Sequence, residues 1–288
     1  MIAETDLSLD DGRTLHVYDT GSSDTGPGNA GPGSLPVFWH HGSPNTGTPP
    51  EPLFPAAAER GIRWVSFDRP GYAGSTPRPG RDIASVAGDV ASVADALGIG
   101  QFAVMGHSGG GPHALACAAL LPDRVLATVA MSSPAPYGAA GLDWSAGMAP
   151  AQAEEIRATV AGRAPLEQYL ASHEFDPDVF TAADMAALMG DWAWLAQVAG
   201  LAMAGSPDGY LDDAMAGVAP WGFAAEQVKP PVLLVHGDED QMVPSAHSRW
   251  LAAHCRDAEL WLRPGDGHVS VLGTSAGAAL DWLAGRSG

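Results

Sequence analysis

The sequence has few of the residues that stabilise small secreted proteins or that bind nucleic acids. Its 288 residues include two cysteines, which excludes a disulfide scaffold, and neither Cys117 nor Cys255 belongs to a metal-binding C-x-x-C pair. Its 14 lysine and arginine residues stand against 33 aspartate and glutamate residues, giving a formal net charge of −19. Such an acidic surface repels phosphate groups, so we expect neither nucleic acid nor an anionic membrane as a partner.

The sequence also lacks long apolar runs. No segment approaches the ~20 apolar residues that cross a bilayer, and the N-terminus has neither the basic nor the apolar region of a signal peptide. Apolar residues still make up 46% of the chain, enough to form a large core. We therefore expect a soluble, cytoplasmic protein with a small-molecule substrate, without a cofactor or metal, and leave a homodimer open.

The order of apolar segments predicts an α/β fold. The first twenty residues alternate around a turn at Asp10-Asp11-Gly12, which predicts a hairpin, and the polar stretch from Gly21 to Ser34 predicts a mobile loop. After it, six short apolar strands are expected at Pro36–His40, Arg63–Phe67, Phe102–Met105, Leu126–Met131, Val232–His236 and Glu259–Leu262. Helices are expected between or after them, near Pro52–Glu59, Ile83–Leu97, Gly109–Leu121, Ser245–Arg256 and Ser270–Arg286. This alternation predicts a mostly parallel sheet covered by helices on both faces.

The alternation stops between Ser133 and Ala225, where the sequence is helical throughout with prolines between the helices. We therefore expect a core formed by residues 1–133 and 226–288, interrupted by a helical cap at residues 134–225. Thr181-Ala182-Ala183-Asp184 resembles an N-terminal capping box within this cap.

One motif predicts a nucleophile. Gly106-His107-Ser108-Gly109-Gly110 stands directly after a predicted strand and directly before a predicted helix. A serine on such a sharp turn is held in an unfavourable backbone conformation that exposes its hydroxyl, and the residues two before and two after it must be small. The helix N-terminus also directs free N–H groups at the reaction centre.

A nucleophilic serine needs a base and a group that orients the base. His268 follows the last strand in a glycine-rich loop, at the same edge of the sheet as Ser108, and is the expected base. The acid is expected in the turn after the strand at Val232–His236, where spacing favours Asp240 and places Asp238 second. The order Ser108, Asp240, His268 matches the order serine, acid, histidine.

These motifs together resemble the α/β-hydrolase fold superfamily, and the resemblance covers nearly the whole core. Besides the elbow and triad order, His41-Gly42-Ser43-Pro44 is similar to the family's H-G-x-P loop, and the segment from Asp68 to Ser75 to its D-x-x-G-x-G-x-S motif. The resemblance implies an oxyanion hole formed by the backbone N–H groups of Ser43 and Gly109. It also implies that the cap lies over Ser108 and sets specificity.

The expected reaction is hydrolysis of a carboxylic ester or lactone of a small, neutral, apolar substrate through an acyl-enzyme on Ser108. His107, Trp192, Trp194 and Trp221 are candidates for substrate contact, although the tryptophans could instead pack the cap. Two alternatives stay open. The same triad could perform C–C bond hydrolysis, perhydrolysis or a cyclisation, or the protein could bind a ligand with little turnover.

Overall fold

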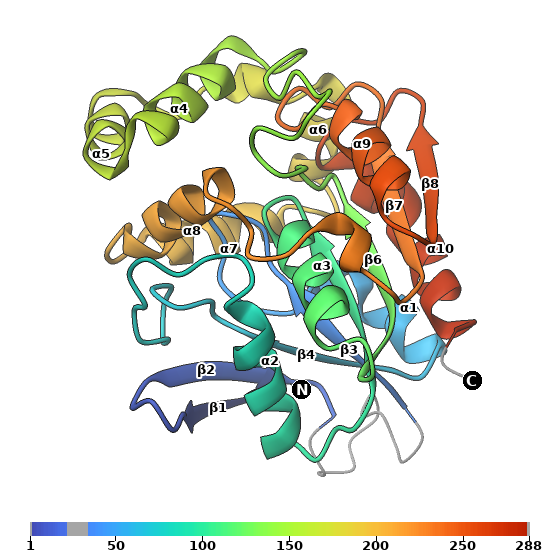
Figure 1. Ribbon diagram of the computed structural model, residues 1–288. Helices are drawn as coiled ribbons and strands as arrows, with labels where there is room; N and C mark the ends of the chain where they lie inside the picture. Colours follow the sequence, from blue (N-terminus) through green and yellow to red (C-terminus); the bar gives the residue numbers. More distant parts are fainter. Residues whose placement is uncertain (1, 22–33, 287–288) are drawn as a thin grey trace.

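The computed structural model describes residues 2–21 and 34–286, and apart from Gly21 and Ser34 the predicted mobile loop lies outside these residues. One eight-stranded sheet runs through the described chain (Figure 1). Its strands are β1 (Ala3–Ser8), β2 (Thr14–Asp19), β3 (Leu35–His40), β4 (Ile62–Phe67), β5 (Phe102–His107), β6 (Val125–Met131), β7 (Val232–Gly237) and β8 (Ala258–Arg263). The six strands predicted after the hairpin are confirmed, each within two residues of its expected ends.

The strands follow the order β1-β2-β4-β3-β5-β6-β7-β8. β1 and β2 form the predicted hairpin, β2 pairs with β4 in the antiparallel direction, and every later pair is parallel. Parallel strands place their carboxyl ends at one edge of the sheet, where open α/β folds bind ligands. The prediction of a mostly parallel sheet is therefore confirmed.

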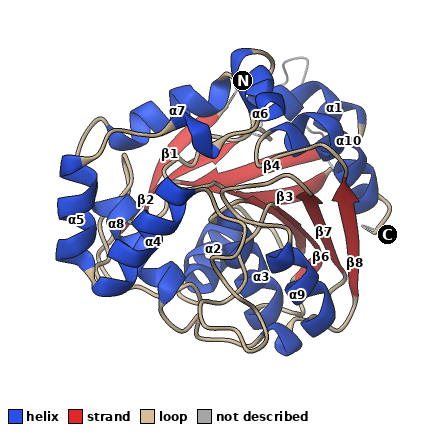
Figure 2. Ribbon diagram, turned by 90° about the horizontal axis from the view of Figure 1, so that it is seen from above, coloured by secondary structure: helices blue, strands red, loops and turns tan. Residues whose placement is uncertain are grey.

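Helices cover the two faces of the sheet (Figure 2). α2 (Val86–Ala96), α3 (Gly110–Leu120) and α9 (Ala246–His254) pack on one face around Phe38, Val104 and Leu234. α1 (Phe54–Glu59) and α10 (Ser270–Ala284) pack on the other face around Trp39 and Met105. Successive residues of a strand point to opposite faces, so these nearly continuous apolar strands supply both cores.

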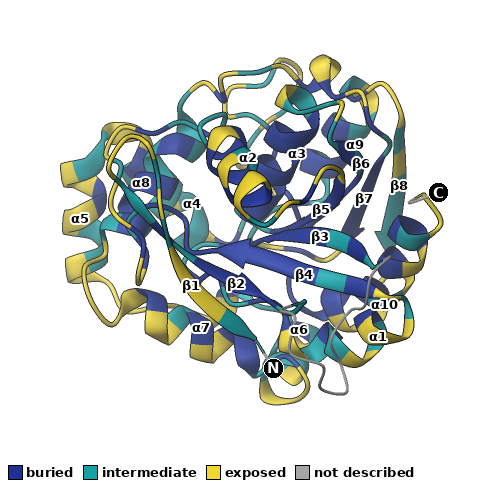
Figure 3. Cartoon of the chain, turned by 90° about the horizontal axis from the view of Figure 1, so that it is seen from below, coloured by how far each residue is buried: buried dark blue, intermediate teal, exposed yellow. Residues whose placement is uncertain are grey.

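Exposure of the strands changes across the sheet (Figure 3). Every residue of β5 and β7 is buried, whereas β1 at the edge is mostly exposed and has a polar sequence. A polar, exposed edge strand limits pairing with other chains. Residues of the central strands are therefore the ones held most firmly by packing, and the catalytic candidates follow them.

Five helices lie between β6 and β7 in the sequence, at the position of the predicted cap. They are α4 (Pro150–Ala161), α5 (Arg163–Ser172), α6 (Ala182–Met189), α7 (Trp194–Met203) and α8 (Asp208–Val218). We call residues 134–225 the insertion. α6 begins with the reciprocal Thr181–Asp184 capping box that the sequence predicts, and α4 begins with a proline at its first position. Across residues 2–21 and 34–286, no helix is long and apolar enough to cross a membrane.

Candidate active site

Ser108 occupies the turn between β5 and α3 in a strained conformation. Its φ of 53° lies in the left-handed region, which residues other than glycine seldom adopt. A hydrogen bond from its backbone N–H to the carbonyl oxygen of Met131 (2.9 Å) fixes the turn to the neighbouring strand. A Cβ on Gly106 would overlap the carbonyl of Gly110, and a Cβ on Gly110 would overlap that of His40. Both glycines are therefore required by close backbone approach, as the motif predicts.

His268 and Asp240 form a buried pair. Nδ1 of His268 donates to Oδ2 of Asp240 over 2.8 Å, and both side chains are almost fully buried. Burial alone would lower the pKa of His268, but the Asp240 carboxylate raises it above its ordinary value. Burial likewise opposes ionisation of Asp240, but His268 and His236 hold its pKa below its usual range. The pair is thus built to stabilise an imidazolium ion.

The structure distinguishes the two carboxylates that the sequence left open. Oδ1 of Asp240 accepts hydrogen bonds from the backbone N–H groups of Met242 and Val243, each 2.9 Å long, so its second oxygen is directed at His268. Asp238 is exposed and accepts a hydrogen bond from Gly265 N–H instead. The geometry therefore favours Asp240 as the partner of the histidine.

His236 is a further positioning residue, for which the sequence holds no specific signal. At the end of β7, its Nε2 donates to the carbonyl oxygen of Val243 (2.6 Å) and lies 3.2 Å from Oδ2 of Asp240. Its Nδ1 accepts from the hydroxyl of Ser248 over 2.7 Å. This buried imidazole holds the Asp240 turn in place.

Ser108 and His268 line the same cavity, which we call the apolar cavity. It has a volume of about 370 Å³ and is lined by residues of the core together with apolar side chains of the insertion, among them Phe175, Phe180 and Leu195. No hydrogen bond joins Ser108 Oγ to His268 in the described chain; such bonds are often long in free enzymes and tighten when substrate binds.

The backbone N–H groups of Ser43 and Gly109 lie beside Ser108. A Cβ on Gly109 would come 3.6 Å from the Ser43 nitrogen, and one on Gly42 would come 3.6 Å from Cβ of Ser108. Within residues 2–21 and 34–286, neither the Ser43 nor the Gly109 N–H donates a hydrogen bond. His113 Nδ1 donates to the carbonyl of Gly109 over 2.8 Å, which fixes the following peptide, between Gly109 and Gly110. Two backbone N–H groups without a hydrogen-bond acceptor among the described residues therefore lie close to Ser108.

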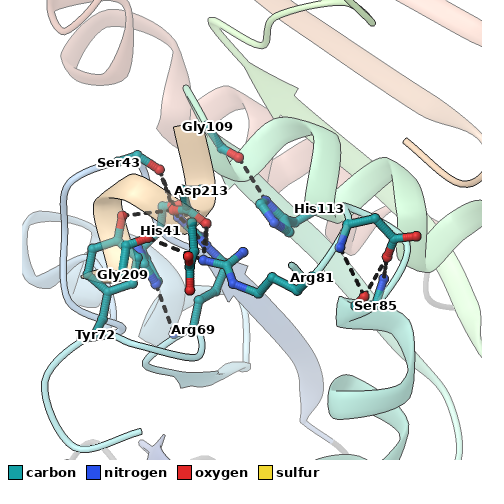
Figure 4. Close-up of polar contacts among 12 residues, drawn as sticks. His41, Ser43, Arg69, Tyr72, Arg81, Ser85, Gly109, His113, Gly209 and Asp213 are labelled. Carbon is teal, nitrogen blue, oxygen red and sulfur yellow. Dashed lines mark hydrogen bonds and ion pairs between the residues drawn. The ribbon is translucent and has the colours of Figure 1, made fainter. Parts of the chain in front are cut away.

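A buried charge cluster holds the Ser43 side of the site (Figure 4). Asp213 of α8 accepts hydrogen bonds of 2.5 Å from the Ser43 hydroxyl, from Arg69 and from Arg81, and one of 2.8 Å from Tyr72. Burial opposes ionisation of Asp213, but the two guanidinium groups hold its pKa well below its usual range. The insertion thus supplies the carboxylate that fixes the Ser43 loop.

A second carboxylate of the insertion holds the histidine loop. Asp184, at the start of α6, accepts hydrogen bonds from the backbone N–H groups of His268 (3.1 Å), Val269 (2.8 Å) and Ser270 (2.8 Å). A Cβ on Gly267 would overlap its carboxylate. Burial opposes its ionisation, but these hydrogen bonds lower the pKa of Asp184. The capping box predicts only its local role, so this second role was missed.

His107 contacts the histidine loop and lines the apolar cavity. Its Nε2 donates to the carbonyl oxygen of His268 over 2.9 Å, and the two rings lie 5.0 Å apart. Burial, followed by the effect of His268, lowers the pKa of His107 to about 3, so the ring is neutral. Its place beside the serine therefore combines contact with the cavity and support of the loop.

The candidate tryptophans lie in different places. Trp221 lines a second cavity that also reaches Ser108, together with Trp144, which the sequence did not single out for substrate contact. Trp192 and Trp194 do not line either cavity; both are buried in the core cluster that contains α10, where their rings lie 6.4 Å apart. They pack the insertion against the sheet because a large apolar ring is most stable in that core.

The described residues contain no group of three histidine, cysteine, aspartate or glutamate side chains that could hold a metal ion.

Known proteins resemble this chain over most of its length. The profile of the alpha/beta hydrolase fold family matches residues 36–273. A non-heme chloroperoxidase of Streptomyces lividans is 29% identical over 241 residues, covering 82% of each protein. A non-heme haloperoxidase of Rhodococcus erythropolis is 28% identical over 262 residues, covering 86% of this chain and 91% of the relative. Among solved structures, an esterase from Thermogutta terrifontis aligns with a TM-score of 0.72 at 20% identity, covering 99% of this chain and 100% of its own.

Proposed function

The chain belongs to the α/β hydrolase fold family, and from that premise we propose that it is a serine hydrolase that cleaves a carboxylic ester or lactone. One observation carries the proposal: the strained Ser108 and the Asp240-bonded His268 open into the same cavity. A nucleophile and a base that share a cavity, with the base oriented by a third group, form a triad.

In the proposed reaction the Ser108 oxygen attacks the ester carbonyl while His268 Nε2 takes the hydroxyl proton. Asp240 stabilises the imidazolium, and the N–H groups of Ser43 and Gly109 bind the oxyanion. His268 then gives its proton to the leaving alcohol oxygen as the C–O bond breaks. Water, deprotonated by the same histidine, attacks the acyl-enzyme, and the carboxylic acid leaves as Ser108 regains its proton.

The apolar cavity supports an apolar group on the substrate. Its walls include Phe175, Phe180, Leu188 and Leu195, which favour burial of hydrocarbon surface. His268 must protonate the departing oxygen, so the part of the substrate in this cavity is the alcohol side.

Hydrogen peroxide as the acceptor is a second candidate. Two relatives of this chain, a non-heme chloroperoxidase and a non-heme haloperoxidase, favour it by their names. Peroxide attack on the same acyl-enzyme would break the bond to Ser108 and release a peracid in place of the acid.

The test compares wild-type protein with Ser108→Ala. We expect wild type to be labelled by a fluorophosphonate probe and to hydrolyse p-nitrophenyl butanoate, and the variant to lose both, with a rate loss on the order of 10⁶. Peracid formation in the presence of acetate or an acetate ester and peroxide would support the second candidate. Saturable ligand binding without labelling or turnover in a folded wild type would refute the catalytic proposal.

A further inference from the structure

Two cavities meet at Ser108, and they differ in chemistry. The second, which we call the acidic cavity, has a volume of about 150 Å³ and shares Ser43, Ser108 and Met242 with the apolar cavity. Its walls include Trp144, Glu155, Tyr210, Asp213 and Trp221. An ester bound with its carbonyl at Ser108 extends in two directions from that carbon, so each half of the substrate can occupy one cavity.

The position of His268 indicates which half of the substrate occupies which cavity. His268 lines the apolar cavity but not the acidic cavity, whereas Gly109, a proposed oxyanion donor, lines the acidic cavity. The leaving alcohol must depart beside the histidine that protonates it. The acyl half therefore lies in the acidic cavity. This assignment rests on the proposed serine-hydrolase function.

Glu155 places a carboxyl group without a cationic partner among the described residues on the wall of the acidic cavity. Its carboxylate accepts a hydrogen bond from the Tyr210 hydroxyl and has no other partner in the part of the chain that the structure describes. The neighbouring Asp213 is different, because Arg69 and Arg81 neutralise it. Burial raises the pKa of Glu155, and the hydrogen bond from Tyr210 opposes that change. A half-buried carboxylate without a cation is a costly arrangement that a cationic ligand would relieve.

Aromatic side chains stand around the same cavity. Trp144, Tyr210 and Trp221 line it together with Glu155, and the Trp144 indole is fixed by a hydrogen bond of 2.9 Å to the carbonyl of Ala135. Aromatic faces attract ammonium groups, and a carboxylate supplies the counter-charge. The formal net charge of −19 attracts cations to the protein as well.

We propose that the acidic cavity binds an ammonium group on the acyl half of the substrate, with Glu155 as its counter-ion. The substrate class is then an ester between an amino acid and an apolar alcohol. The sequence analysis expects a neutral substrate. Glu155, on a cavity that Ser108 also lines, is a local feature that the net charge of the chain does not reveal.

The test uses two benzyl esters of the same size. Benzyl 3-aminopropanoate and benzyl butanoate differ only in an ammonium group that replaces a methyl group. We expect wild type to prefer the ammonium ester by about tenfold in kcat/KM, after division by the ratio of the two alkaline hydrolysis rates, which removes the difference in intrinsic reactivity. Glu155→Gln should abolish the preference. Glu154→Gln, which removes an equal charge from the exposed neighbour on α4, should keep it.

A measurement on wild type alone guards against misfolding of the variant. Propylammonium should inhibit benzyl butanoate hydrolysis competitively, at concentrations at least tenfold below those of propan-1-ol. Equal turnover of the two esters after this correction, equal inhibition by the two small molecules, or a preference that survives in a folded Glu155→Gln would overturn the ammonium site. Absence of any Ser108-dependent ester hydrolysis would instead overturn the proposed function.

Discussion

Replacing Asp184 by asparagine tests whether the insertion positions His268, the proposed base. Oδ1 of Asp184 accepts from Val269 N–H, Ser270 N–H and the Ser270 hydroxyl, and Oδ2 accepts from His268 N–H and Thr181 N–H. If the asparagine side-chain oxygen occupies the position of Oδ1, the hydrogen bonds from Val269 and Ser270 are kept. Its NH₂ group then faces the two donors that Oδ2 had satisfied.

The loss of stability follows from those two donors. Each buried N–H left without an acceptor costs about 1–3 kcal/mol, so the variant should lose about 2–6 kcal/mol of unfolding free energy. Typical domains have about 5–15 kcal/mol, so folded protein should still be obtained. A histidine loop that shifts by ~1 Å would lower kcat by on the order of 10².

The charge of Asp184 adds a readout that packing alone would not change. Its carboxylate is among the groups that raise the pKa of His268. Removing that charge lowers the pKa of His268, so the acid limb of the kcat/KM profile should move to lower pH. Asp191→Asn removes a charge from an exposed position just after α6 and should leave the limb in place.

The assays are urea denaturation and the pH dependence of p-nitrophenyl butanoate hydrolysis, each measured for wild type and both variants. If Asp184→Asn matched Asp191→Asn in both the unfolding free energy and the acid limb, the positioning role of Asp184 would be refuted.

Two further predictions concern the elbow and the base. Gly106→Ala should destabilise the protein on the order of 3 kcal/mol and abolish activity, because the added Cβ overlaps the Gly110 carbonyl. Gly88→Ala in α2 meets nothing within 4 Å and should stabilise by up to about 1 kcal/mol, so equal unfolding curves for the two variants would contradict the packing argument. His268 must be neutral to accept a proton, and its pKa is raised from 6.5, so wild-type kcat/KM should fall as pH decreases through a midpoint above 6.5. A rate that stayed constant down to about pH 5 would refute His268 as the base.

The elbow could be predicted because its requirements are local. Strand, turn and helix follow one another within a few residues, and Gly106 and Gly110 are dictated by backbone contact inside that turn. Ser108, Asp240 and His268 come to one edge of the sheet because each follows the carboxyl end of a parallel strand. In the same way, the hairpin at Asp10-Asp11-Gly12 could be predicted from its own residues alone.

Residues of the insertion could not be assigned, because their roles depend on contacts between segments far apart in the chain. Asp184 is explained locally as part of a capping box, which hides its bonds to a loop 84 positions later. Asp213 reaches Ser43 across 170 positions, and nothing near it in the sequence indicates that contact. Trp192 and Trp194 are large aromatic residues of the kind that line cavities, but they are buried in the core beside α10 instead.

The buried pairing of Asp213 with two arginines has a consequence for engineering chimeric enzymes. Arg69 and Arg81 come from the segment between β4 and α2, whereas the carboxylate that neutralises them comes from α8. Exchanging the insertion for that of another protein would leave two guanidinium groups in the interior without a counter-ion, which is strongly destabilising. The donor must bring an acidic residue to the same place, or both arginines must be replaced together. Specificity is therefore safer to change by substitutions along the cavity walls than by transplanting whole helices.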